Sequence, residues 1–269
     1  MKNSCIFFVS TPLHILNSII VALNEYKTYN CVLVFIDQPK NRENHYFNVI
    51  KKWNKSPFKK ILYYNSTGNL NKYQHRKNIF KNLKIELSKI SCSKIYTCND
   101  RRIEFIYSYK FLKKKNKNIK CFYIDDGIMS YIIHKYSWES PLEILIKKLY
   151  YGSWYNKTQI VGSSKFITNS IVAFPKFVHR YLKKNNPIML QIDFFKKNIF
   201  LSFLKKTLKS FNEKQNIKNL KYILILPHQI ELKKYWNFYS QLKKNLIDLN
   251  KSSYKIGIKY HPFQNGDPL

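Results

Sequence analysis

Short apolar runs alternate with longer segments of mixed polarity over residues 1–125. Runs of this kind are typical of strands that are buried on both faces of a sheet. We expect strands at residues 5–10, 31–36, 60–64, 93–97 and 119–124. The segments between them have helical spacing, and we expect helices over 12–26, 43–53, 74–90 and 101–114. This alternation predicts an α/β domain of the Rossmann type, with a parallel sheet and a ligand cleft at the carboxyl ends of the strands.

The remainder of the chain shows a weaker pattern. Residues 130–193 are less regular, apart from a helix expected over 141–150, and a further helix is expected over 194–211. The polar stretch 212–219 is the candidate linker, and it precedes a strand–helix–strand pattern at 221–226, 231–249 and 254–259. One such unit is too small to close a sheet and cover both of its faces. We therefore expect an N-terminal Rossmann-like domain over 1–190 and a partial C-terminal domain over 220–269.

The formal net charge of +33 limits the choice of partners. Such a charge fits nucleic acid, an anionic membrane or an acidic substrate. Lysine carries nearly all of it, and the chain is also rich in Asn, Ile, Tyr and Phe, which AT-rich genomes over-use. Compositional drift is therefore our first explanation and attraction to an anionic membrane surface the second. No nucleic-acid partner is expected, because the lysines are spread along the chain and no binding signature accompanies them.

The cysteines and histidines argue against a disulfide framework and against a metal site. The chain has five cysteines without a C-x-x-C pair, and three of them lie within apolar runs, where cysteine is usually a small core residue. The histidines at positions 45, 75, 134 and 179 lack metal-ligand spacing. No run reaches the ~20 apolar residues that a membrane span requires. We expect a cytoplasmic protein, whose membrane contact would be peripheral, at the inner face of the cytoplasmic membrane.

The first candidate for chemistry is the sequence Asp125-Asp126-Gly127, directly after a predicted strand. Two carboxylates at the carboxyl end of a strand project into the cleft, and their mutual repulsion favours a raised pKa, which suits a general base. Gly127 allows the backbone to turn sharply. A simple Asp-Asp-Gly turn is the alternative interpretation.

Further candidates follow other predicted strands. Ser10 and Thr11 lie at the first strand-to-helix junction, where Thr11 suits the N-cap and Pro12 the first helical position. Hydroxyls and free backbone N–H groups at such a junction bind anions. A well-made helix start explains the same residues.

Two histidines follow strands of the second unit. His261, held by the rigid Pro262, follows the strand at 254–259, where a protonated imidazole would stabilise a leaving phosphate. His228 follows the strand at 221–226, and we place it by topology near the base or phosphate of a nucleotide donor. Both histidines also fit ordinary polar loops.

Three motifs occur together and in chain order: Ser10-Thr11-Pro12-Leu13-His14, Asp125-Asp126-Gly127 and His261-Pro262, the last preceded by Lys259. The set resembles the bacterial sialyltransferases and capsule polysialyltransferases, which share an acidic-acidic-Gly motif and a His-Pro motif. The resemblance spans nearly the whole chain, although each motif is short.

The resemblance implies a GT-B glycosyltransferase with two Rossmann-like domains that face a cleft. It implies inverting, metal-independent transfer of sialic acid from CMP-sialic acid to a cell-surface glycan or glycolipid, such as O-antigen, capsule or lipooligosaccharide. Asp125 or Asp126 would deprotonate the acceptor hydroxyl, and His261 would contact the CMP phosphate. Ser10 and Thr11 would line the cleft near the donor, and no cofactor is implied besides the donor itself.

The chain departs from the family at its end. In the family a Ser-rich motif beyond the His-Pro motif helps to hold the donor phosphate, and none follows here before Leu269. We therefore expect a C-terminally truncated chain with weak or no activity. Two alternatives stay open: another GT-B transferase of surface polymers, such as one that uses CDP-glycerol, and a basic nucleic-acid-binding protein.

Overall fold

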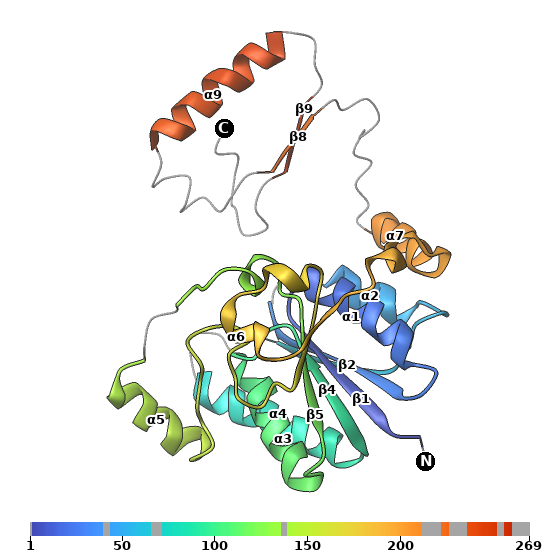
Figure 1. Cartoon of the computed structure of the whole chain (residues 1–269), viewed down its shortest axis with the longest axis vertical. Helices are drawn as coiled ribbons and strands as arrows, with labels where there is room; N and C mark the ends of the chain where they lie inside the picture. The colour runs from blue at the N-terminus through green and yellow to red at the C-terminus, as the bar shows by residue number, and fades with distance from the viewer. Residues whose placement is uncertain are drawn as a thin grey trace. The chain divides into compact units, whose positions relative to one another are not determined.

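The computed structural model describes residues 2–39, 44–65, 72–135, 139–210, 222–225, 236–251 and 256–259. The chain divides into two compact units, Met1–Phe211 and Asn212–Leu269. The first unit is an α/β layer structure around one sheet (Figure 1).

Strands and helices alternate along the first unit. Its strands are β1 (Ser4–Val9), β2 (Asn30–Gln38), β3 (Phe58–Asn65), β4 (Cys92–Thr97), β5 (Lys120–Ile124), β6 (Asn169–Val172) and β7 (Pro187–Met189). Its α-helices are α1 (Pro12–Glu25), α2 (His45–Lys51), α3 (Lys72–Ser88), α4 (Ile103–Lys115), α5 (Pro141–Tyr151), α6 (Arg180–Lys183) and α7 (Asn198–Ser210). Three short 3-10 helices complete it: η1 (Gly127–Ser130), η2 (Pro175–Phe177) and η3 (Ile192–Lys196).

The seven strands pair in the order β3-β2-β1-β4-β5-β6-β7, and every pairing is parallel. Strand β1 pairs with β2 on one side and with β4 on the other. The connections therefore run in opposite directions from β1, which makes the carboxyl ends of β1 and β4 the topological switch point of the sheet. In open sheets of this type, ligands bind outside that point.

Both faces of the sheet are buried, which explains why β1 is apolar from Cys5 to Val9. Successive side chains of a strand point to opposite faces. Phe7 and Val9 pack into a core with residues of α1, α2 and α7, whereas Ile6 and Phe8 pack into a second core with residues of α3 and α4. Figure 1 shows these two groups of helices on opposite sides of the sheet.

The sequence pattern predicts one helix and no strand in 130–193, and the structure differs in this irregular segment. It contains β6 and β7, which extend the sheet beyond β5. Both are short, and Pro187 opens β7 at the edge of the sheet, where the missing N–H of proline is tolerated.

The first unit continues past residue 190. The ring of Phe203 in α7 lies 5.0 Å from that of Trp53, which follows α2. This contact and the core shared with α1 hold α7 on the first unit.

In the second unit, β8 (Tyr222–Ile225) and β9 (Ile256–Lys259) pair in parallel, and α9 (Trp236–Lys251) lies between them in sequence. The described residues thus have the expected strand–helix–strand order. The expected linker at 212–219 lies outside the described residues.

Candidate functional site

The carboxyl ends of β1, β4 and β5 bring together residues that are far apart in sequence. Ser10 follows β1, Asn99 follows β4, and Asp125 and Asp126 follow β5. These ends are adjacent because the strands are neighbours in the parallel sheet. The site therefore forms at the switch point of the fold.

Helix α1 presents His14 to this site. The Thr11 side chain accepts a hydrogen bond from the backbone N–H of His14 at 3.3 Å, which is an N-cap interaction, and Pro12 follows at the first helical position. The helix start expected from the sequence is confirmed. It places the His14 imidazole in the first turn, with only 3% of its side chain exposed.

A hydrogen-bonded chain runs from Ser10 through His14 to Asp126. The backbone N–H of Ser10 points at His14 Nδ1 at 3.4 Å, and Ser10 Oγ lies 3.1 Å from the same atom. Because a backbone N–H only donates, Nδ1 is an acceptor and the ring proton is on Nε2. His14 Nε2 therefore donates to Asp126 Oδ1.

Asn99 holds the other oxygen of the same carboxylate. Its Nδ2 donates to Asp126 Oδ2 at 3.4 Å. The Asp126 side chain remains 12% exposed. Asp126 is thus oriented by two neighbours and is still in contact with solvent, as a group that exchanges protons with a ligand must be.

Asp125 has a different environment. Its Oδ1 accepts from the Gly127 N–H at 2.8 Å and from Ser130 Oγ at 2.9 Å. Its Oδ2 accepts from the Ala173 N–H at 2.8 Å and from the Tyr131 hydroxyl. The residue is 3% exposed. Asp125 therefore ties β5, η1 and the residue after β6 together, and all of its acceptor sites are directed at the protein.

Gly127 makes the turn between these elements possible. Its φ is +75°, a value that L side chains rarely adopt, and an added Cβ would lie 3.0 Å from Leu13 Cδ2. The sharp turn expected after the two aspartates is present. It lets α1 approach the end of β5 closely.

The structure brings five of the sequence-predicted site residues to this one edge: Ser10, Thr11, Asp125, Asp126 and Gly127. The other three, His228, His261 and Pro262, lie outside the described residues. The roles assigned to all eight remain predictions. Among the described residues, no group of three or more His, Cys, Asp or Glu side chains could hold a metal ion.

Sequence reasoning included His14 in the Ser10–His14 motif without giving it a role, and it missed Asn17 and Asn99 as members of the site. Asn17 Nδ2 donates to the Asp125 carbonyl oxygen at 2.9 Å and so fixes α1 against the end of β5. A signal was available for His14, because residues four apart around a helix start lie close together, and His14 is four residues after Ser10. Asn99 gives no such signal before β4 and β5 are known to be neighbours.

Comparison with known proteins gives a fold and not a family. No protein-family model and no curated protein match the chain. Similar solved structures include the UDP-N-acetylglucosamine 2-epimerases of Methanocaldococcus jannaschii (TM-score 0.51, 14% identity, 97% of this chain and 66% of that chain) and Rickettsia bellii (0.49, 13%, 97% and 63%). Another is an alpha/beta-galactoside alpha-2,3-sialyltransferase from Photobacterium phosphoreum (TM-score 0.46, 13% identity, 85% of this chain and 65% of that chain).

At these identities the likeness concerns the fold alone. The match to the M. jannaschii enzyme, together with the seven-stranded parallel sheet, shows an α/β fold of the GT-B type with a Rossmann-like first unit. The chain spans 63% and 66% of the length of the two epimerases.

Proposed function

We propose that this chain is a glycosyltransferase that transfers sialic acid from CMP-sialic acid to a hydroxyl group of a cell-surface glycan. One observation supports the proposal above all: the partly exposed carboxylate of Asp126, held by His14 at the switch point of a GT-B-type fold. The order of the short motifs along the chain supports the choice of donor.

Asp126 is the base in this proposal. Its carboxylate accepts the proton of the acceptor hydroxyl while that oxygen attacks the anomeric carbon of sialic acid and CMP leaves from the opposite face. The configuration at that carbon is inverted. Asp125 does not compete for this role, because its oxygens already accept four hydrogen bonds from the protein.

His14 is a positioning residue. Its Nε2–H fixes one oxygen of Asp126, and the two donors of Ser10 keep Nδ1 in the accepting state. This arrangement sets both the tautomer and the direction of the carboxylate. Loss of His14 is expected to lower turnover without removing the base itself.

The donor is proposed to bind outside this edge of the sheet, as ligands do in open parallel sheets. By the resemblance of the His261-Pro262 motif, His261 would contact the CMP phosphate and stabilise the charge that develops on it. His228 would contact the nucleotide, while Ser10 and Thr11 would line the cleft near the donor. The proposal requires no cofactor besides the donor.

Release of CMP tests this function. The full chain would be incubated with CMP-sialic acid and a panel of galactosides and sialosides. Asp126→Asn is expected to lower kcat by roughly 100- to 10,000-fold, the range of a general base. Asp193→Asn is the matched control, because the Asp193 side chain is 85% exposed and its carboxylate lies 3.8 Å from Lys196 Nζ. Wild-type turnover that Asp126→Asn leaves intact contradicts the assignment of the base.

The same assay separates the alternative donor. CDP-glycerol also yields CMP on transfer, and turnover with it and not with CMP-sialic acid identifies a different transferase of surface polymers. Conversion of UDP-N-acetylglucosamine would point instead to the reaction named for the two epimerases of similar fold.

We place the acceptor at an anionic membrane surface. Leu142, Leu145 and Leu149 of α5 recur at helical spacing and are 65%, 54% and 76% exposed. Lys147 and Lys148 lie beside them in sequence, and the chain as a whole carries +33. An apolar helix face flanked by lysines binds membrane interfaces that contain anionic lipid. Among the helices described, none is long and apolar enough to cross a membrane.

A further inference from the structure

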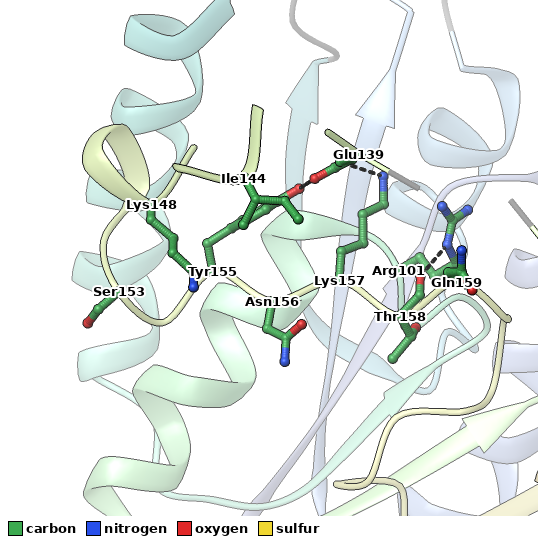
Figure 2. Close-up of a pocket in the computed structure, with 10 residues that line it drawn as sticks. All are labelled: Arg101, Glu139, Ile144, Lys148, Ser153, Tyr155, Asn156, Lys157, Thr158 and Gln159. Atoms are coloured by element: carbon green, nitrogen blue, oxygen red, sulfur yellow. Dashed lines mark hydrogen bonds and ion pairs between the residues drawn. The ribbon is translucent and has the colours of Figure 1, made fainter. Parts of the chain in front are cut away.

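A basic cavity lies beside the candidate site and has no role in the chemistry described so far. It encloses about 350 Å³ between α5, the residues after α5 and the loop after β4. Figure 2 shows Arg101, Lys148 and Lys157 around it, with Glu139 at one wall. A neighbouring cavity of about 260 Å³ shares Arg101, Glu139 and Lys157.

Positive charge exceeds negative charge around this cavity. Glu139 is the one carboxylate among the residues that line the larger cavity. It already accepts from the Tyr155 hydroxyl at 2.6 Å, and it pairs with Lys147 at 2.9 Å and with Lys157 at 3.7 Å. The carboxylates of the neighbouring cavity are engaged with other arginines, Asp37 with Arg102 and Glu104 with Arg76.

Lys148 is exposed, but the lysines next to it are partly buried. The side chain of Lys157 is 33% exposed and that of Lys147 is 21% exposed. Burial, and then the positive charge of Arg101, lower the pKa of Lys157. Cations that are partly desolvated and close together are stabilised by an anion that binds between them.

The cavity is tied to the candidate base. Asn99 lines the neighbouring cavity, and its Oδ1 accepts from the Arg101 backbone N–H at 3.1 Å while its Nδ2 donates to Asp126 Oδ2. The Arg101 Nε donates to the Thr158 carbonyl oxygen at 2.8 Å, which fixes the side chain at the cavity wall (Figure 2). A ligand held by Arg101 would therefore have a defined position relative to Asp126.

We propose that Arg101, Lys148 and Lys157 bind a negatively charged group, a phosphate or a carboxylate, on the acceptor sugar. The identification of this sugar as the acceptor rests on the proposed function, whereas the anion site itself does not depend on it. The cavity volume is at the lower end of the range for small-ligand sites, as a monosaccharide requires. Ser153 and Asn156 at its wall offer hydrogen bonds to sugar hydroxyls.

Direct binding to the full chain tests the inference without any turnover. The probes are a hexose phosphate, a hexuronic acid and the neutral hexose, each titrated by calorimetry. We expect the anionic probes to bind and the neutral hexose to bind far more weakly. Lys157→Gln and Lys148→Gln should each weaken anion binding roughly 10- to 100-fold, the effect of one hydrogen bond to a charged group. Lys205→Gln is the control, since Lys205 is exposed on α7.

A charge-conserving variant and the following outcomes decide the matter. Lys157→Arg keeps the charge, so it should retain binding where Lys157→Gln loses it, and both should unfold at the wild-type temperature. Equal affinity for neutral and anionic sugars, or equal loss in Lys205→Gln, overturns the inference. Anion binding without CMP release contradicts the proposed function alone, whereas CMP release to a neutral acceptor that Lys157→Gln leaves unchanged contradicts only the assignment of the bound anion to the acceptor.

Discussion

At the scale of single residues, we expect substitutions of the adjacent residues Asp125 and Asp126 to change the free energy of unfolding by very different amounts. Asp125→Ala removes a buried acceptor from two backbone N–H groups and two hydroxyls. Buried donors left without a partner destabilise the fold, and we expect a loss of roughly 3 kcal/mol or more in the free energy of unfolding. Asp126→Asn should change that free energy by less than about 1 kcal/mol, because an amide keeps the shape and part of the bonding.

Urea unfolding of the two variants and the wild type checks this contrast. A small loss of unfolding free energy in Asp125→Ala, together with a large loss in Asp126→Asn, would contradict the structural role assigned to Asp125. Circular dichroism at the start of each titration confirms that the variant begins folded.

The sequence predicted where the two aspartates lie but not which of them is accessible to a ligand. The Asp-Asp-Gly motif after a strand locates both carboxylates at the sheet edge. The distinction depends on partners that are remote in sequence: Asp125 bonds to the residue after β6, and Asp126 to His14, which is 112 residues away. Such contacts exist only once the sheet order is fixed, so no local pattern contains them.

At the scale of elements, the segment between α5 and β6 is fastened by two buried side chains. The carboxylate of Asp100 accepts from the N–H groups of Gly162 and Ser164 at 2.7 and 2.9 Å. His179, at the start of α6, donates from Nε2 to the Val161 carbonyl oxygen at 3.1 Å. In the described part of the chain, His179 Nδ1 is buried and has no hydrogen-bond partner. A second proton on that ring would thus be buried without an acceptor.

This environment predicts a loss of stability in mild acid. Burial lowers the pKa of His179 from its ordinary value of 6.5. The unfolded chain therefore takes up a proton at a higher pH than the folded one, so stability is full above about pH 6.5 and falls as the pH drops towards the folded pKa. In His179→Gln this part of the dependence should be absent.

Unfolding temperatures measured from about pH 7.5 down to about pH 5 test the prediction. The wild-type curve should fall more steeply than that of His179→Gln. Replacement of the exposed His134 by Gln serves as the control and should leave the slope unchanged. Parallel curves for the wild type and His179→Gln would contradict a neutral buried imidazole.

The sequence predicted the first strands of the sheet but not the last two. Residue 5 to residue 9 is apolar throughout because both faces of β1 are buried, so the first strands stood out in the sequence. The strands β6 and β7 did not, since they are only four and three residues long, and β7 begins with a proline. Their identity as strands comes from pairing with β5 and with each other, which is a property of the sheet and not of the segment.

At the scale of the whole molecule, the alternation of strands and helices was enough to predict the fold class. It did not give the strand order, which places β1 between β2 and β4 and so makes their carboxyl ends the site. The sequence shows a net charge of +33, but it does not show which partner, if any, this charge attracts. In the structure, exposed leucines on α5 lie close in sequence to lysines. Membrane binding can therefore be tested at one particular surface.

That surface predicts binding to anionic membranes by two separable contributions. Exposed lysines such as Lys148 of α5 are attracted to anionic headgroups, at about 1 kcal/mol for each basic residue near the surface, and salt screens this attraction. The leucines enter the interface and contribute apolar burial, which salt does not weaken. The full chain should therefore sediment with vesicles that contain phosphatidylglycerol, and far less with neutral phosphatidylcholine vesicles.

The variants separate the two contributions. Leu142→Ser combined with Leu149→Ser should weaken binding to anionic vesicles at every salt concentration, because the apolar part is lost. Leu208→Ser is the matched control, since Leu208 is 68% exposed on α7, away from α5. If the α5 variant and the Leu208 variant bind alike, the attraction comes from the charge of the whole chain and not from this helix. In that case compositional drift accounts for the lysines, and an acceptor at the membrane has to be sought by other evidence than the surface of α5.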